Sequence, residues 1–202
     1  VGGCATGNTS SQTTTTASSS PRQADGVPVL PRAIEREVGA VYPDAALQSY
    51  VDRVGQKLVT GSALKGAYRF VVLDLPVVNA HAIVPGYVFV TRGLLAVLDD
   101  EAELAAALGH ELGHLIERHA AQRARARQGV VDAAVEAAAA TGSVIVGRSV
   151  ARDGMLALRR YSREQELEAD RIGLAYVVQA GYRGNAMASL IDRLRQQSRL
   201  EA

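Results

Sequence analysis

Two histidines and a glutamate at residues 110–114 (His-Glu-Leu-Gly-His) have the types and the spacing of a catalytic metal site. On a helix, His110 and His114 lie one turn apart on the same face, where both imidazoles can bind one metal ion. Glu111 is rotated roughly 100° around the helix axis, so it can reach a water on that metal but is poorly placed to bind the metal itself. Such a set can hydrolyse a peptide bond with zinc, but zinc usually takes three protein ligands, so one more is required.

The remaining histidines are weak candidates for the third ligand. If the helix continues, His119 lies about 140° around from His114 and faces away from the metal, so we expect a capping or packing role for it. A single histidine such as His81 is more often structural, although a position near the cleft stays open. The only cysteine, Cys4, lies near the start of the sequence. We therefore expect a carboxylate as the third ligand.

Residues 161–170 (YSREQELEAD) supply the best carboxylate candidates. On a helix, one face of this segment alternates two carboxylates with two small residues, which are Glu166, Ala169, Asp170 and Gly173. We expect Glu166 to be the third metal ligand. Asp170, one turn further, can accept a hydrogen bond from the other ring nitrogen of a ligand histidine. The alternative is an ordinary charged helix face with Arg163 and Arg171 as ion partners.

Small residues on both helices indicate how this carboxylate could reach the metal. Gly109 and Gly113 lie beside the two histidines, and each mid-helix glycine costs about 1 kcal/mol relative to alanine. Two such glycines indicate a packing reason, because they would let a helix carrying Ala169 and Gly173 approach closely. An ordinary charged face does not account for these small residues.

Hydrophobic periodicity predicts an α+β fold that is mostly helical. Helical patterns cover residues of about 29–41, 44–60, 100–115, 156–180 and 186–200. Asp99 or Asp100 is expected to cap the helix of the metal motif, with Glu103 as its capping-box partner. Alternating stretches at 68–75 and 87–91 predict strands of a small sheet beside that helix. We expect the Ala- and Val-rich residues 130–146 to form a packed helix or hairpin, with light membrane contact as the less favoured option.

Composition and charge exclude several classes of protein. The 202 residues include 22 basic and 21 acidic side chains, and 48% are hydrophobic. A net charge of +1 gives no sign of a nucleic-acid binder, and no uncharged apolar run is long enough to span a membrane. A basic run contains Arg118, Arg123, Arg125 and Arg127. We expect this run to be a solvated face, and contact with anionic lipid headgroups is the alternative.

The first residues resemble the end of a bacterial lipoprotein signal. In Val1-Gly2-Gly3-Cys4, an aliphatic residue and two small ones precede a cysteine that such proteins lipidate, so we expect a lipid anchor on Cys4. Residues 5–26 are rich in Ser and Thr and predict a flexible tether without a core. We therefore predict a lipoprotein N-terminus and tether at 1–28 and a metallopeptidase domain at 29–202. Ala5 resembles the pattern of lipoproteins sent to the outer membrane.

Several motifs in order give the chain a family resemblance. HELGH, the following Arg118-His119, and SREQELEADRIG at 162–173, followed by Ala180-Gly181-Tyr182, resemble the HtpX-like and CAAX-prenyl-protease-like zinc metallopeptidases, and most closely their soluble periplasmic lipoprotein branch. The resemblance extends from about residue 32 to the C-terminus. It implies a zincin-like fold with one Zn²⁺ bound by His110, His114 and Glu166. It also implies that Glu111 is the catalytic base and that Asp170 supports a metal ligand without binding the metal itself.

Residues 78–95 are similar to the strand that borders the cleft in this family. The chain departs from the family pattern here, because His81 and Val84-Pro85-Gly86 stand where Phe and Pro-Gly-Gly are usual. An extended substrate could pair with residues 87–91 by adding a strand to the sheet. We therefore predict that the substrate-binding residues are Asn79, Tyr87, Val88 and Phe89.

Together these features predict a zinc metalloendopeptidase. Its expected substrates are envelope proteins of a Gram-negative bacterium, cleaved at the periplasmic face of the outer membrane in protein quality control. The alternative is a zinc-stabilised chaperone or binding lipoprotein for envelope assembly, in which catalysis is secondary; the intact Glu111 argues against it, because a structural site has no use for that carboxylate. An exopeptidase would need a pocket for a substrate terminus, and no sequence feature indicates one.

Overall fold

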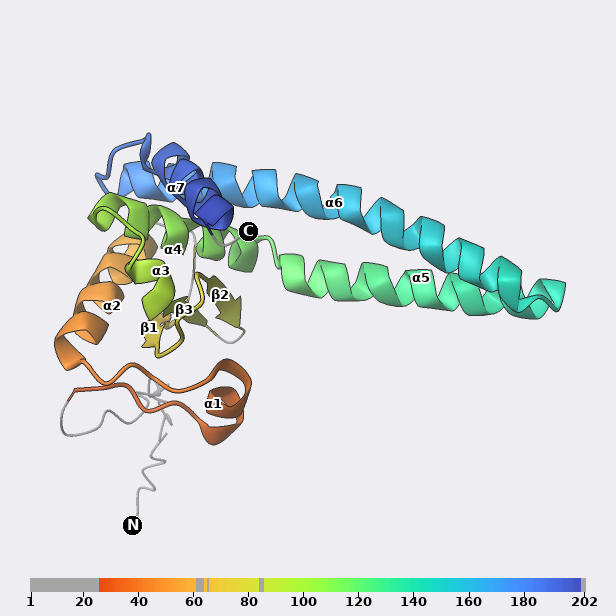
Figure 1. The fold of residues 1–202 in the computed structure, drawn as a ribbon, viewed down its shortest axis with the longest axis horizontal. Coiled ribbons are helices and arrows are strands. Elements are labelled where there is room, and N and C mark those ends of the chain that lie inside the picture. The colour runs from red at the N-terminus through yellow and green to blue at the C-terminus, as the bar shows by residue number, and fades with distance from the viewer. Residues whose placement is uncertain (1–25, 61–63, 65, 84–85, 201–202) are drawn as a thin grey trace, which may run out of the picture.

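A small mixed sheet lies at the centre of the fold (Figure 1). The computed structural model describes residues 26–60, 64, 66–83 and 86–200. In these residues the strand order is β1-β3-β2, with β1 parallel to β3 and β2 antiparallel to it. The strands are β1 (Arg69–Leu73), β2 (Ala80–Ile83) and β3 (Tyr87–Thr91). The predicted strands at 68–75 and 87–91 thus form, and β2 is an additional strand that the sequence analysis did not predict.

Helices cover both faces of the sheet. Successive side chains of a strand point to opposite faces. Val88 and Val90 accordingly pack with the residues of α2 (Ala45–Thr60) and α4 (Glu101–Ile116), whereas Tyr87 and Phe89 pack with Leu30 and α1 (Arg32–Val38). All five residues of β3 are buried. The central strand is therefore enclosed by side chains on both faces and by strands on both edges.

Aspartate side chains cap the first turns of α4 and α2, and the cap of α4 is the one that the sequence predicts. Asp100 caps α4, since its Oδ1 accepts hydrogen bonds from the backbone N–H groups of Ala102 and Glu103 at 2.9 and 3.0 Å. Glu103 accepts from the N–H of Asp99 at 2.9 Å, one residue before the donor that a capping box at Asp100 would use. Asp44 caps α2 by accepting from the N–H of Leu47 at 2.9 Å. These bonds satisfy backbone donors that have no partner in the first turn.

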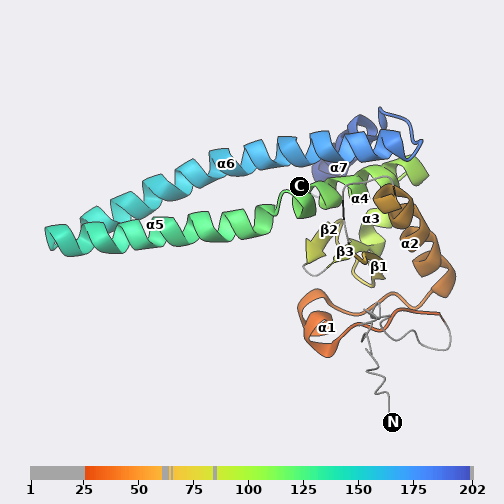
Figure 2. The same ribbon diagram turned by 180° about the vertical axis from the view of Figure 1, so that it is seen from behind.

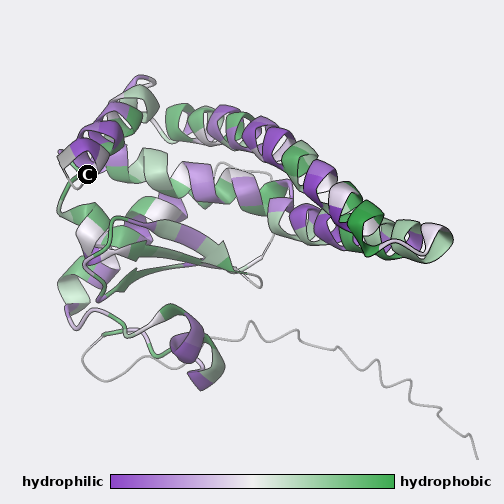
Figure 3. Ribbon diagram, turned by 45° about the vertical axis from the view of Figure 1, so that its right-hand side comes forward, coloured by the Kyte–Doolittle hydropathy of each residue, from purple (hydrophilic) through white to green (hydrophobic). Residues whose placement is uncertain are grey.

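A long helical hairpin extends away from the sheet (Figures 1 and 2). It consists of α5 (His119–Thr141) and α6 (Val144–Gln179), joined at Gly142, which has a positive φ of 63°. The Ala- and Val-rich residues 130–146 form the far end of this hairpin, which is one of the two predicted arrangements. α6 begins at Val144, twelve residues before the predicted start at 156. Figure 3 shows polar and apolar residues interspersed along this arm. The sequence pattern therefore does not indicate where α6 begins.

Two further helices, α3 (Arg92–Leu95) and α7 (Ala186–Leu200), lie beside the sheet and α4. α7 packs across α4, and α3 follows β3 directly (Figure 1). The predicted helix at 186–200 therefore forms with the expected bounds. No helix in the described part of the chain is both long and apolar enough to cross a membrane. Cys4 and most of the predicted tether lie outside the described residues, so the anchor and the boundary at 28/29 stay predictions.

Candidate metal centre

α4 and α6 approach each other through their small residues. A Cβ placed on Gly113 would lie 2.6 Å from the carbonyl oxygen of Ala169, and one on Gly173 would lie 2.7 Å from the backbone nitrogen of His110. Real Cβ atoms do not come this close to backbone atoms, so larger side chains would push the helices apart. The predicted close packing of the two motif helices is thus confirmed, and it carries Glu166 to the histidines.

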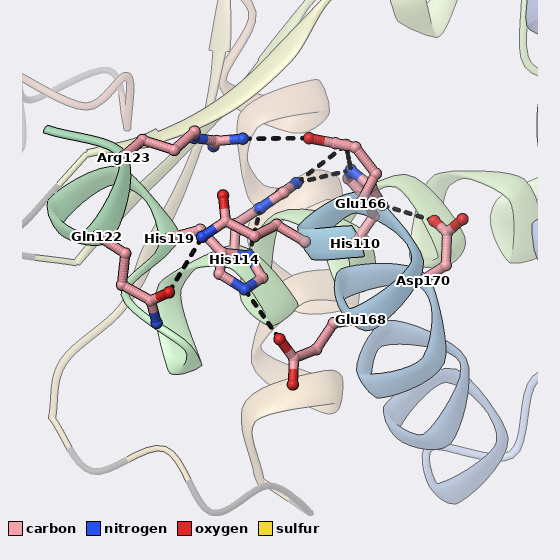
Figure 4. A network of polar contacts seen from close by, with 9 residues as sticks. His110, His114, His119, Gln122, Arg123, Glu166, Glu168 and Asp170 are labelled. Atoms are coloured by element: carbon pink, nitrogen blue, oxygen red, sulfur yellow. Dashed lines mark hydrogen bonds and ion pairs between the residues drawn. The ribbon is translucent and has the colours of Figure 1, made fainter. Parts of the chain in front are cut away.

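Three side chains converge where the two helices meet (Figure 4). The Nε2 atoms of His110 and His114 are 3.0 Å apart, and Oε2 of Glu166 lies 3.4 and 3.3 Å from them, respectively. Zinc holds N and O ligands at about 2.0–2.1 Å in a tetrahedron, which separates neighbouring donor atoms by roughly 3.3–3.4 Å. The two imidazoles and the carboxylate therefore fit a single zinc ion in both donor type and spacing.

Two further charged groups hold members of this triad. Asp170 lies behind His110, with its Oδ1 2.7 Å from Nδ1 of that ring, as predicted from its place one turn after Glu166. Arg123 of α5 donates from Nη1 to Oε1 of Glu166 at 3.2 Å, so the other carboxylate oxygen faces the histidines. Partial burial raises the pKa of Glu166, but His114, His110 and Arg123 together outweigh this effect and lower the pKa of that carboxyl.

The basic run between α4 and α5 is exposed at Arg125 and Arg127, as expected. Arg123 is the member of the run that reaches the site.

His119 lies behind His114, which corrects the expectation that it faces away. The helix does not continue: α4 ends at Ile116, and Arg118 takes left-handed backbone angles (φ 55°, ψ 36°) before α5 begins. This break turns His119 back, so that its Nδ1 lies 2.8 Å from Nδ1 of His114. Its Nε2 lies 3.2 Å from Oε2 of Glu168 on α6. The expected packing role is right in one respect, because His119 is completely buried.

Sequence comparison identifies the family of this domain. The profile of peptidase family M48 matches residues 45–200. The chain belongs to peptidase family M48. The predicted α+β fold and the predicted class of enzyme, a metallopeptidase, are thereby confirmed. The HtpX-like, CAAX-prenyl-protease-like and lipoprotein branch within the family stays a prediction.

Curated relatives occur in bacteria and in mitochondria. The beta-barrel assembly-enhancing protease of Escherichia coli (strain K12) is 27% identical over 168 residues, which are 77% of this chain and 34% of that protein. A Vibrio cholerae protein that carries the same name provisionally is 30% identical over 171 residues, 79% of this chain and 35% of that protein. The mitochondrial metalloendopeptidase OMA1 of Schizosaccharomyces pombe is 32% identical over 167 residues, 79% of this chain and 49% of that protein. The chain thus spans a third to a half of the length of these relatives.

A cleft beside the triad is the natural place for a substrate of this M48 domain. His110 and Glu111 line a cavity of about 240 Å³, together with Asn79 and Ala80. The opposite wall consists of apolar side chains of α7, which are Met187, Leu190, Ile191 and Leu194. The cleft thus joins the motif to an apolar surface, and the structure places Asn79, one of the predicted substrate residues, in its wall.

The other predicted substrate residues do not line this cleft. Tyr87, Val88 and Phe89 are buried in β3, whose two edges are already paired with β1 and β2. A substrate strand cannot be added to a central strand, so this expectation is wrong. β1 and β2 are the edge strands in the described part of the sheet. The outer edge of β1 carries a bridge between Leu73 and Val41, whereas β2 lines the cleft through Ala80, so β2 is the edge to which a substrate strand can be added. The ring of His81 lies beside that of Phe89, with ring centroids 5.2 Å apart and the planes tilted by 31°, so His81 faces the α1 side of the sheet.

The environment of the M48 motif sets the charge of its side chains. Burial and the neighbouring His110 lower the pKa of His114 to about 4, so its imidazole is neutral at pH 7 and able to bind a metal. Burial raises the pKa of Glu111, and the nearby charge of Glu166 raises it further, against the opposing effect of His110 and Arg123. Glu111 therefore holds a proton more readily than an exposed glutamate, which suits a group that must accept one and release it.

Proposed function

We propose that this chain is a zinc-dependent metalloendopeptidase in which His110, His114 and Glu166 hold the metal. The convergence of these three donors at 3.0–3.4 Å, with Glu111 beside them in the cleft, is the observation that carries the proposal. A zinc ion supplies Lewis-acid activation of water and of the scissile carbonyl when it is bound. Neutral imidazoles and one carboxylate are the ligand set of catalytic zinc sites that leave a position open.

Glu111 is the general base of the proposed reaction. Its carboxylate accepts the proton of the attacking water and delivers that proton to the leaving amine. Burial moves the pKa of this carboxyl upward, toward neutral pH, and a general base whose pKa lies near the working pH both accepts and releases a proton efficiently. Asp170 holds the His110 ring from behind, which keeps the imidazole in the orientation that the site requires.

The cleft favours cleavage within a chain over removal of a terminal residue. A substrate backbone can extend along the edge of β2, while its side chains contact the apolar wall of α7. Among the described residues that line the cleft there is no Lys or Arg to bind a terminal carboxylate. The acidic residues in the lining, Glu111 and Asp170, already have roles at the motif. An extended, partly apolar segment of an unfolded protein is the substrate class that fits.

The proposed setting is the cell envelope of a Gram-negative bacterium. The name of the Escherichia coli relative supports a role in the quality control of envelope proteins. We further propose a lipid anchor on Cys4 that holds the domain at the outer membrane, facing the periplasm, on the strength of the lipoprotein-like residues 1–4. Substitution of Cys4 by Ser in the full-length precursor should then move the protein from the membrane fraction to the soluble fraction. Retention of the variant in the membrane fraction would contradict the anchor.

The variant Glu111→Gln tests the enzymatic proposal. It should bind one zinc ion per chain, as wild type does, and lose cleavage of an unfolded protein such as reduced casein. The control is Glu164→Gln, which alters an exposed carboxylate on α6 and should leave cleavage unchanged. Mass spectrometry of the products should show internal cleavage. Undiminished proteolysis by Glu111→Gln would refute the mechanism, and stepwise loss of terminal residues would favour an exopeptidase.

A further inference from the structure

We propose that His119 is a positioning residue that links His114 to the carboxylate of Glu168 and thereby fixes the metal-binding tautomer of His114. This inference rests on the proposed metal site. The carboxylate of Asp170 contacts His110 directly, with its Oδ1 2.7 Å from Nδ1 of the ring. His114 has the buried imidazole of His119 in that place, and the carboxylate of Glu168 lies on the far side of this second ring. The two ligand histidines are thus supported in different ways.

The hydrogen bonds allow one arrangement of protons that is compatible with metal binding. A metal on Nε2 of His114 requires the proton of that ring to be on Nδ1. This N–H points at Nδ1 of His119, 2.8 Å away, which must then be an acceptor. A neutral imidazole that accepts at Nδ1 carries its proton on Nε2. That proton lies where His119 faces Oε2 of Glu168, at 3.2 Å, and the carboxylate accepts it.

The opposite arrangement is disfavoured at both ends. If His119 carried its proton on Nδ1, it would donate to His114 and force the proton of His114 onto Nε2, the atom that must bind the metal. Nε2 of His119 would then present a lone pair to the carboxylate of Glu168. The negative charge of Glu168 therefore selects the tautomer of His119, and His119 selects the tautomer of His114. Both imidazoles are largely shielded from water, and low polarity strengthens such a chain of hydrogen bonds.

The backbone between α4 and α5 places His119 for this role. Arg118 is the one residue other than glycine with a positive φ in the described part of the chain, at 55°. Left-handed angles are unfavourable for a residue with a Cβ, and such outliers cluster at functional sites. Without this break, His119 would continue the α4 helix and point away from His114. The chain thus adopts an unfavourable conformation at the point that turns the second imidazole toward the ligand.

Zinc affinity distinguishes a positioning role from simple packing. His119→Phe keeps a buried ring and removes both hydrogen bonds; we expect its zinc dissociation constant, measured by competition with a chromophoric chelator, to rise about 10- to 100-fold. His119→Asn keeps an acceptor near the position of Nδ1 and should recover part of the affinity. Glu168→Ala should weaken zinc binding in the same direction, whereas Glu164→Ala, on an exposed residue of the same helix, should not. The unfolding temperature of each metal-free variant shows whether it is folded.

Two results would overturn the inference. A folded His119→Phe protein whose dissociation constant for zinc is within twofold of wild type would show that His119 only fills space. In zinc-loaded wild type, long-range ¹H–¹⁵N spectra of the histidine rings should show His119 protonated on Nε2, and protonation on Nδ1 would contradict the proposal even if the variants fail to fold. Failure of wild type to bind zinc would instead refute the proposed function, so the two failures are distinguishable.

Discussion

Gly113 of α4 lies directly against the backbone of Ala169 on α6, where a Cβ on the glycine would be 2.6 Å from the Ala169 carbonyl oxygen and 2.9 Å from its Cα. This contact lies between the two halves of the site, because Gly113 precedes His114 and Ala169 precedes Asp170. The distance between the helix backbones therefore determines whether the carboxylates of α6 reach the imidazoles of α4. Packing of the domain and assembly of the triad depend on the same small residues.

Substitution of Gly113 by Ala should consequently weaken both the fold and the site. The added methyl group must push α6 away, and overpacking of this kind costs about 1–3 kcal/mol in the free energy of unfolding. The matched control is Gly129→Ala on α5, where an added Cβ meets nothing within 4 Å. This control should gain up to about 1 kcal/mol from the better helix propensity of alanine. Chemical denaturation measures both changes, and zinc titration should show weaker binding for Gly113→Ala alone.

Asp170→Asn tests the direct support of a metal ligand. An asparagine oxygen still accepts a hydrogen bond from Nδ1 of His110, but it lacks the negative charge that raises the basicity of the ring. We expect zinc affinity to fall about tenfold, toward the low end of the range for such outer groups. Asp153→Asn, at an exposed position on the same helix, is the control. Equal affinity of the two variants would show that Asp170 matters only for packing.

The residues of the motif helices could be predicted from the sequence, because helical periodicity alone fixes which side chains share a face. His110 and His114 on one helix, and Glu166 and Asp170 on another, are brought together as predicted. His119 could not be placed in this way. The break before it contains neither glycine nor proline, so no local sequence signal marks the left-handed conformation of Arg118.

The order of the strands in the sheet is a second feature that could not be predicted from the sequence. β2 has four residues, Ala-His-Ala-Ile, too few for periodicity to distinguish a strand from a loop. The resemblance of residues 78–95 to a cleft-bordering strand therefore points to residues 87–91, the one strand that the pattern predicts within this segment, as the strand that pairs with a substrate. Strand order depends on contacts between distant segments, and it places β3 in the centre of the sheet and β2 at one edge.

Acidic pH should remove the stabilisation that the ion pair between Arg183 and Asp100 gives to the fold at the start of α4. A hydrogen bond from Arg183 at 2.5 Å, together with the backbone N–H groups that Asp100 caps, lowers the pKa of the Asp100 carboxyl. Because the folded pKa lies below the unfolded value, this stability is present above about pH 4 and is lost as the pH falls through the folded pKa. Asp100→Asn preserves the helix cap and removes the charge.

The expected consequence is a difference in stability that depends on pH. Asp100→Asn should unfold at a slightly lower temperature than wild type at pH 7, and the difference should shrink at acidic pH. Both partners are about 40% exposed, so the effect at pH 7 should be below about 1 kcal/mol. Asp192→Asn, which removes a weaker and more exposed pair with Arg195, should behave like wild type at every pH. A constant difference between Asp100→Asn and wild type across pH would refute the assignment.

The edge of β2 offers a test of how the substrate backbone is bound. The N–H of Thr91 donates to the carbonyl of Asn79, and hydrogen-bonded pairs alternate along antiparallel strands. The backbone groups of His81 therefore face β3, whereas those of Ala80 and Ala82 face the free edge. Proline at an edge position with an outward N–H leaves the sheet ladder intact. Ala82→Pro should thus remove one donor available to a substrate and spare the fold.

We expect Ala82→Pro to lower kcat/KM for an unfolded protein substrate about 2- to 10-fold, the effect of losing one hydrogen bond of about 0.5–1.5 kcal/mol. Zinc affinity should not change, because Ala82 is not among the described residues that line the cleft with His110 and Glu111. Ala82→Ser is the matched control, since serine keeps the N–H and adds only a hydroxyl. If Ala82→Pro cleaves as fast as Ala82→Ser, the substrate does not pair with β2. Binding would then depend on the apolar wall of α7, and substitution of Ile191 by Glu should become the more damaging change.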